Sequence, residues 1–288
     1  MSIVVTGATG HLGHLVVESL LNRGASPDEV VATGRNAERL AELAAALGVR
    51  TAVADYADPA SLRAAFEGAD RVLLVSGSEV GQRVAQHTAV VQAAKDAGVG
   101  LIAYTSIPYA DTSRLILATE HRATEEAIRA SGVPFTFLRN SWYLENYLPQ
   151  IPTYLEHGVA GAAGDGRISA ATRADFADAA AAALLDPDSA GRVYELGGAG
   201  FTLAELAATV ADASGRPVSH TEVSPEQLTA ILVGAGVPQP YAEALVSADL
   251  GIARGELEVT TGDLARLIGH TPTSLRDAVD ASLGTLAA

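Results

Sequence analysis

The chain has 288 residues, of which 48% are hydrophobic and 18% are charged, as is typical of a globular protein with one large domain or a domain and a half. A formal net charge of −15 argues against a nucleic-acid partner, because a nucleic-acid-binding surface needs a basic patch. Cysteine is absent, which excludes disulfides, thiolate metal sites and a cysteine nucleophile.

The beginning of the chain combines a buried strand, a glycine turn and the start of a helix. Ile3–Val5 runs into Thr6–Gly13, and an apolar helical pattern follows to about residue 22. Gly7 would permit a tight turn, Gly10 would let backbone N–H groups approach a pyrophosphate, and Gly13 would allow close helix–strand packing. A turn without a ligand is the alternative, but a position between an apolar strand and a helix favours a dinucleotide site. The predicted cofactor-binding residues are Gly7, Ala8, Thr9, Gly10, His11, Leu12 and Gly13.

The second strand indicates which dinucleotide binds. Residues 29–35 form a strand pattern that ends without the acid that commonly holds an unphosphorylated ribose. Arg35 at the end of this strand is predicted to bind the 2′-phosphate of NADP(H). The alternative is that Arg35 is a solvated surface residue without a ligand. A third strand, at 51–56, contains Asp55. Its carboxylate could accept from the adenine amino group or could cap a helix that begins near Pro59, and both interpretations stay open.

Strands and helices continue to alternate up to about residue 138. Further buried strands are expected at 71–75, 101–105 and 135–138, with helices at 80–97 and 119–131. This alternation predicts an α/β fold with a doubly wound parallel sheet (Rossmann), in which ligands bind beyond the carboxyl ends of the strands. The cofactor candidates at these ends are Ser76, Gly77, Ser78 and Thr105.

The regular alternation ends near residue 144. Two prolines and the glycine-rich stretch 158–166 predict a crossing loop, and Thr172 and Thr202 are placed to cap helices. Strands are expected at 192–196 and 218–222, followed by helical stretches at 226–235, 241–248 and 274–282. Residues 1–150 should therefore form an NADP(H)-binding Rossmann domain. Residues 151–288 should form a smaller, mostly helical substrate-side lobe with segments that return to the sheet.

Seven segments carry a resemblance to a known family, and they are Thr6–Gly13, Ser76–Arg83, Ala103–Ser106, Thr119–Glu125, Leu138–Tyr147, Gly164–Ile168 and Leu267–His270. They resemble the NmrA-like branch of the atypical short-chain dehydrogenases, and within it the bacterial type 2 NADPH:quinone oxidoreductases. The resemblance implies NADPH as cofactor and a two-electron, flavin-independent transfer of hydride to a quinone. Alternatives within the branch are a redox sensor that binds NADP(H) without catalysis and a reductase of triphenylmethane dyes. The match through 139–147 and the C-terminal lobe favours an enzyme, because a sensor need not keep a substrate cleft.

The usual catalytic pair of short-chain dehydrogenases is missing. In that pair, Tyr-x-x-x-Lys, the lysine lowers the pKa of the tyrosine so that its hydroxyl can deliver a proton. Tyr104 and Tyr109 are followed four positions later by Pro108 and Ser113, and the single lysine, Lys95, lies on a predicted helix away from the strand ends. Alcohol dehydrogenation is thereby disfavoured. A quinone accepts hydride readily, so positioning can supply most of the catalysis.

The resemblance places residues 139–147 over the nicotinamide half of the cofactor. The predicted catalytic residues are Asn140, Tyr143 and Tyr104, with Asn140 as the strongest candidate. Asn140, Ser141, Trp142 and Tyr143 complete the cofactor-binding set, and the predicted substrate residues are Tyr109, His121, Trp142 and Tyr143. The structural alternatives are core packing for Tyr104, helix capping or solvent exposure for His121, and a contact between lobe and sheet for the two aromatic residues.

Few other partners are expected from the sequence. The histidines show no H-x-x-x-H or H-E-x-x-H spacing, so no metal site is predicted. The longest apolar run, at 177–185, is interrupted by Asp178 and is far too short to insert into a membrane. We expect a cytoplasmic protein, since no secretory signal is evident and the cofactor is NADPH. A homodimer is one assembly that the sequence allows.

Overall fold

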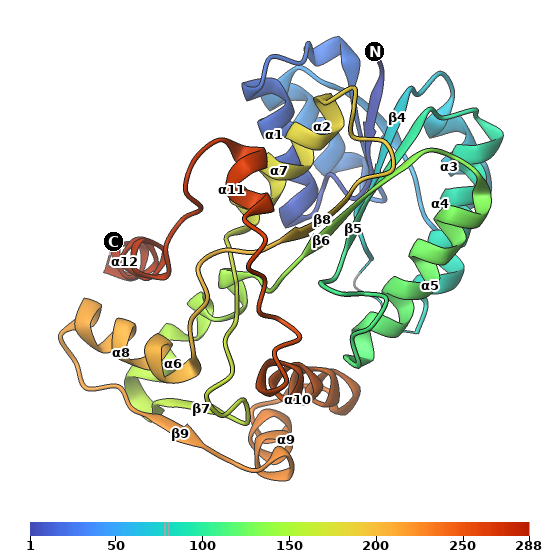
Figure 1. The fold of residues 1–288 in the computed structure, drawn as a ribbon. Coiled ribbons are helices and arrows are strands. Elements are labelled where there is room, and N and C mark those ends of the chain that lie inside the picture. The colour runs from blue at the N-terminus through green and yellow to red at the C-terminus, as the bar shows by residue number, and fades with distance from the viewer. Residues whose placement is uncertain (78, 80, 288) are drawn as a thin grey trace.

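A computed structural model describes residues 1–77, 79 and 81–287, and it contains a parallel sheet with strand order β3-β2-β1-β4-β5-β6-β8 (Figure 1). Its strands are β1 (Ile3–Val5), β2 (Val30–Gly34), β3 (Arg50–Val53), β4 (Arg71–Leu74), β5 (Leu101–Ser106), β6 (Phe135–Asn140) and β8 (Val193–Leu196). The chain builds outward from β1 in one direction through β3 and then in the other from β4, so the order reverses between β1 and β4. The predicted doubly wound parallel sheet is confirmed, and its reversal point is where such sheets bind ligands.

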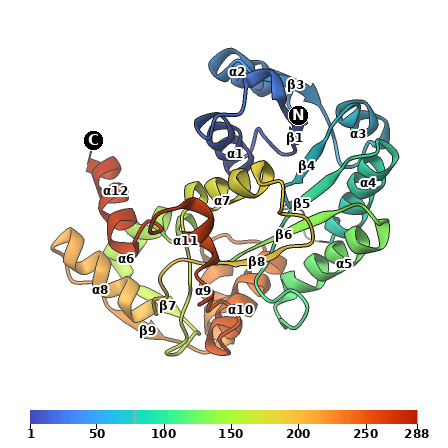
Figure 2. The same cartoon turned by 45° about the horizontal axis from the view of Figure 1, so that its top comes forward.

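Helices cover both faces of the sheet, which explains why its central strands are almost continuously apolar (Figures 1 and 2). The helices connecting these strands are α1 (His11–Asn22), α2 (Ala37–Leu47), α3 (Pro59–Phe66), α4 (Arg83–Asp96), α5 (Ile116–Ser131) and α7 (Arg173–Leu185). The pairs α3·α4 and α4·α5 pack together on one face, and α1 packs against α7 on the other. The alanines of α7 are buried there, and their small side chains allow the close approach of α1.

The second half of the chain forms a lobe beside the sheet (Figure 1). Its elements are α6 (Ile151–His157), β7 (Val159–Gly161), α8 (Leu203–Ser214), β9 (His220–Glu222), α9 (Pro225–Gly234), α10 (Gln239–Ala253), α11 (Asp263–Ile268) and α12 (Leu275–Ala287). Strand β8 returns to the main sheet beside β6, and α11 packs on α7. The division of the chain near residue 150 stays a prediction.

Several local expectations are confirmed and others are corrected. Thr172 and Thr202 accept hydrogen bonds from the N–H groups of Asp175 and Glu205, both at 3.1 Å, and cap α7 and α8. The crossing loop predicted before residue 166 is wrong in part, because it contains α6 and β7. Pro152 lies in the first turn of α6, where a proline costs no hydrogen bond. In the described residues, no helix has both the length and the apolar composition to span a membrane.

Candidate active site

The glycine turn after β1 is built as its spacing predicts. Gly7 has a φ of +61°, a conformation that glycine adopts without strain. A Cβ on Gly13 would lie 2.4 Å from the carbonyl oxygen of Gly7, so only glycine lets α1 approach the turn this closely. The first hydrogen bond at this helix end joins the N–H of His14 to the carbonyl of Gly10 at 3.0 Å. The N–H groups of the first turn therefore point out of the helix end, where an anion can accept from them.

A cavity of about 540 Å³ opens at this turn, which is a common size for a ligand site. Twelve of the predicted cofactor-binding residues line it, namely Gly7, Thr9, Gly10, His11, Leu12, Gly13, Arg35, Asp55, Ser76, Gly77, Thr105 and Tyr143. The structure adds nine that sequence reasoning missed, namely Gly34, Asn36, Arg39, Ala54, Tyr56, Val75, Glu79, Gln86 and Arg173. Ser78, also predicted, lies outside the described residues. The lining therefore joins the ends of β1, β2, β4 and β5 to Tyr143 after β6 and to Arg173 at the start of α7.

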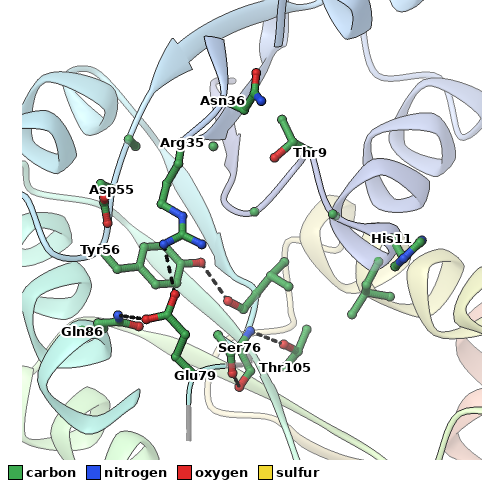
Figure 3. A pocket seen from close by; sticks show the side chains of 18 of the residues that line it. Thr9, His11, Arg35, Asn36, Asp55, Tyr56, Ser76, Glu79, Gln86 and Thr105 are labelled. Atoms are coloured by element: carbon green, nitrogen blue, oxygen red, sulfur yellow. Dashed lines mark hydrogen bonds and ion pairs between the residues drawn. The ribbon is translucent and has the colours of Figure 1, made fainter. Parts of the chain in front are cut away.

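The end of the cavity near β2 carries two arginines. Arg35 follows β2 directly and Arg39 lies in the first turns of α2, which Asn36 caps by accepting from the N–H of Arg39 at 3.0 Å. The Arg35 guanidinium reaches across the cavity to the Glu79 carboxylate, with Nη1 and Oε1 3.0 Å apart (Figure 3). These side chains give the end of the cavity cationic groups of the kind that bind a phosphate.

Asp55 lies on the wall of the same end (Figure 3). Its carboxylate accepts from the N–H of Ala57 at 2.9 Å, while α3 is capped by Asp58, which accepts from the N–H of Ala60. The alternative that Asp55 caps this helix is therefore wrong. The strand also ends at Val53, two residues earlier than Asp55. A contact of Asp55 with adenine stays a prediction.

Buried hydrogen bonds fix the floor of the cavity. The Tyr56 hydroxyl donates to the carbonyl of Val75 at 2.7 Å, and the N–H of Ser76 donates to the Thr105 hydroxyl at 2.8 Å (Figure 3). Burial raises the pKa of Tyr56, so its phenol stays protonated. These bonds join the carboxyl end of β4 to Tyr56 after β3 and to Thr105 of β5.

Behind the floor, His87 of α4 supports the backbone at Gly77. The N–H of Gly77 donates to His87 Nε2 at 3.1 Å, so the ring proton lies on Nδ1, which is 3.0 Å from the Thr124 hydroxyl. Burial and the positive charge of Arg83 lower the pKa of His87 to about 3, so the ring is neutral at physiological pH. Arg83 donates to the carbonyl of Gly77 at 2.8 Å and pairs with Glu120 at 3.0 Å. The sequence signal that could have indicated Arg83 is the resemblance segment Ser76–Arg83, of which only Ser76, Gly77 and Ser78 are predicted to bind the cofactor.

Tyr143 and Arg173 also line the cavity, and Tyr143 follows β6, which lies four strands away from β2 and Arg35 in the sheet. The Arg173 guanidinium carbon lies 4.7 Å from the centroid of the Tyr143 ring, a cation–π contact. The same ring packs edge-on against Phe176 of α7. Burial raises the pKa of Tyr143, and a hydrogen bond with Asn140 and the charge of Arg173 oppose this rise. Tyr143 is therefore a neutral, fixed aromatic wall with a cation beside it.

Asn140 ends β6 and is 4% exposed. Its side-chain Oδ1 is buried and has no hydrogen-bond partner among the described residues. Such an atom is costly unless a ligand or a water molecule satisfies it. Asn140 does not itself line the cavity, but it lies beside Tyr143, which does, so its contact with the cofactor stays a prediction.

Tyr104 and His121 lie together on the face of the sheet that α4 and α5 cover. Tyr104 is fully buried, and its hydroxyl is 2.7 Å from Nδ1 of His121 on α5. Burial raises the pKa of Tyr104 and lowers the pKa of His121 well below its usual value. The alternative of capping or solvent exposure for His121 is wrong, since the residue lies within α5 and is 7% exposed. The geometry therefore favours core packing for both residues over contact with a substrate.

Four other predicted residues are held by contacts of their own. Tyr109 donates its N–H to Glu195 and its hydroxyl to the carbonyl of Glu258, and thereby ties the loop after β5 to the lobe. Trp142 packs against the core of the lobe, and Ser141 donates to the carbonyl of Leu257. Ala8 is fully buried beneath the turn and donates to Thr33. Their predicted roles as cofactor or substrate contacts are not supported by the lining of the cavity.

The residues present suit a phosphorylated dinucleotide. The glycine turn leaves backbone N–H groups facing the cavity, and Arg35 and Arg39 line it beside α2. Tyr143 and Arg173 line it as well and add an aromatic ring and a further cation. In the part of the chain that the structure describes, no group of three or more His, Asp or Glu side chains is arranged to hold a metal ion. The site is thus equipped to bind an elongated anionic ligand and to present one end of it to a second molecule.

Comparisons with known proteins agree with this geometry. The NmrA-like family matches residues 1–258. Quinone oxidoreductase 2 of Escherichia coli K12 is 47% identical over 279 residues, which cover 96% of this chain and 97% of that protein. The crystal structure of an NADPH-dependent quinone oxidoreductase from Escherichia coli, complexed with NADPH, matches with a TM-score of 0.94 at 45% identity and covers 98% and 99% of the two chains. Triphenylmethane reductase of Citrobacter sp., complexed with NADP(H), matches with a TM-score of 0.92 at 39% identity over 98% and 100%.

Proposed function

The chain belongs to the NmrA-like family, and from this premise we propose that it is an oxidoreductase that transfers a hydride from NADPH to a quinone. The transfer is a single two-electron step and needs no flavin. One observation carries the proposal: a single cavity runs from the glycine turn and Arg35 to Tyr143. The similarity to an NADPH-dependent quinone oxidoreductase along almost the entire chain supports the assignment of the substrate.

The two ends of the cavity have different tasks in this proposal. The N–H groups at the start of α1 hold the pyrophosphate, and Arg35 holds the 2′-phosphate. Tyr143, fixed by Arg173 and Phe176, forms the wall of the nicotinamide end. The unpaired Oδ1 of Asn140 accepts a hydrogen bond there and orients the ligand. NADPH, when bound, supplies the hydride.

The reaction also produces a negative charge on the quinone and raises the question of a proton donor. A quinone that receives a hydride becomes an anion, and Arg173 is the cation that lines the cavity beside Tyr143. Tyr104 is separated from the cavity by its burial against His121 and is not required as an acid. The only lysine, Lys95, is exposed near the end of α4, so a Tyr–Lys pair is not formed. Positioning and electrostatics therefore account for the catalysis.

The proposal is tested by steady-state assays with a panel of quinones and a triphenylmethane dye, each with NADPH and with NADH. We expect quinone reduction with NADPH to have the highest kcat/KM. The likeness to triphenylmethane reductase makes the dye the informative competitor. A higher kcat/KM for the dye would assign the chain to dye reduction. Tight NADPH binding without reduction of either acceptor would assign it to the redox sensors.

Location and assembly complete the proposal. We infer a cytoplasmic location from the NADPH cofactor, and a homodimer stays a prediction. Cell fractionation and light scattering of the purified protein would measure the two properties directly.

A further inference from the structure

Arg35 has an anionic partner within the protein. Its Nη1 lies 3.0 Å from Oε1 of Glu79, and the other oxygen of Glu79 accepts from Nε2 of Gln86 at 3.0 Å (Figure 3). The three side chains come from different parts of the fold, namely the end of β2, the segment after β4, and α4. All three line the cavity, so this contact crosses the space that the proposed cofactor enters.

Two anions compete for one guanidinium at this position. The Glu79 carboxylate occupies donors of Arg35 that would otherwise bind a phosphate. A phosphate bound to Arg35 would also lie near the carboxylate, and like charges repel at such distances. A dinucleotide without the 2′-phosphate needs no contact with this guanidinium and meets no such competition.

We propose that Glu79 is a specificity-determining residue that competes with the 2′-phosphate for Arg35. Glu79 lowers the affinity for phosphorylated dinucleotides below the affinity that Arg35 alone would give. The contact with Gln86 holds the Glu79 carboxylate in the competing position. The inference rests on the proposed function, because it takes Arg35 as the residue that binds the 2′-phosphate.

The solvent exposure of the Arg35 and Glu79 side chains limits how much Glu79 can lower the affinity for the 2′-phosphate. The side chains of Arg35 and Glu79 are 66% and 44% exposed, and ion pairs this exposed are weak. Glu79→Gln should therefore tighten binding of the 2′-phosphorylated ligand by about two- to fivefold. The gain should shrink as salt is raised from low to high concentration, because salt screens exposed charges.

Calorimetry with two nicotinamide-free probes isolates this effect from catalysis. The probes are 2′-phospho-ADP-ribose and ADP-ribose, which differ only in the phosphate. Glu79→Gln should tighten binding of the first probe and change binding of the second by less than about 1.5-fold, since the removed competition concerns the phosphate alone. Glu38→Gln is the matched control, because Glu38 is an exposed acid in the first turn of α2 and its replacement removes the same charge.

Each outcome decides one part of the argument. Weaker or unchanged binding of the phosphorylated probe by Glu79→Gln would overturn the inference, since Glu79 would then orient Arg35 or have no effect on it. Equal tightening of both probes, or equal tightening in Glu38→Gln, would overturn it in favour of a general effect of charge. If the unaltered protein shows no preference for the phosphorylated probe, the assignment of Arg35 in the proposed function fails instead.

Discussion

Replacing Gly10 with valine separates the role of the glycine turn in binding from its role in folding. Gly10 has extended backbone angles, with φ −95° and ψ 171°, that any residue adopts. A Cβ at this position meets the carbonyl oxygen of Gly7 at 3.3 Å, and among the residues that the structure describes no other heavy atom outside the neighbouring residues lies within 4 Å of it. The added side chain therefore projects into the cavity that Gly10 lines, where the pyrophosphate is expected.

The expected magnitudes differ widely for folding and binding. Valine is a poorer helix cap than glycine, so Gly10→Val should lower the free energy of unfolding by about 1 kcal/mol or less. A pyrophosphate kept away from two backbone N–H groups loses two charge-assisted hydrogen bonds, each contributing about 1.5–3 kcal/mol. NADPH affinity should therefore fall by about 3 kcal/mol or more, which is a hundredfold or greater rise in Kd.

Urea unfolding and titration of NADPH fluorescence measure the two quantities. Gly13→Ala is the contrasting variant, because its Cβ would lie 2.4 Å from the carbonyl oxygen of Gly7 and 2.9 Å from the Cα of Ala8. Rotation of a side chain cannot relieve a clash with backbone atoms, so the free energy of unfolding of this variant should fall by about 1–3 kcal/mol. A stably folded Gly10→Val protein with unchanged NADPH affinity would refute the placement of the dinucleotide at this turn.

Four further substitutions test the site and the lobe. Arg35→Asp should weaken NADPH binding by a few kcal/mol and abolish the preference over NADH in the same titration, and equal binding of both by the unaltered protein would rule out this role for Arg35. Tyr104→Phe should reduce quinone turnover by about tenfold or less, whereas Asn140→Ala should reduce kcat further, and the reverse order would show that Tyr104 is the catalytic group. Asp249 of α10 is half-buried, and this burial together with the charge of Glu222, opposed by a hydrogen bond from the N–H of Ala162, raises its pKa to about 6. Because the folded chain holds this proton more tightly than the unfolded chain, the free energy of unfolding should fall as the pH rises from about 4 through 6. Asp249→Asn removes this titration, so the free energy of unfolding of the variant, relative to that of the unaltered protein, should be about 1–3 kcal/mol higher at pH 8 than at pH 4. Urea unfolding measures both values, and an identical pH profile in the two proteins would contradict this.

The cofactor half of the site was predictable because its signals are local. Gly7, Gly10 and Gly13 act within one turn, and Arg35 follows its strand directly in the sequence. Each of these predictions depends only on a strand, a turn and the start of a helix. The hydrophobic pattern and the glycine spacing indicate all three elements. The family predicted from these and other segments is confirmed by the match over residues 1–258.

The substrate half was less predictable because its contacts join distant segments. Arg173 reaches Tyr143 across thirty positions of the chain, and Glu79 meets Arg35 across the cavity. A strand pattern also leaves open which face each residue takes. On β5, Thr105 lies at the cavity whereas Tyr104 points to α5, because neighbouring residues alternate between faces. The sequence predicted that β5 ends at the site, but packing decided which of the two side chains reaches it.

The central claim is direct hydride transfer from NADPH to a quinone without a flavin. It is tested most directly by single-turnover quinone reduction, using protein shown by absorbance to be free of flavin and NADPH deuterated at the transferred position of C4. We predict that the quinone is reduced at the same rate with and without added flavin. The chemical step should be slower with the deuterated cofactor. Reduction that occurs only after flavin is added would contradict it.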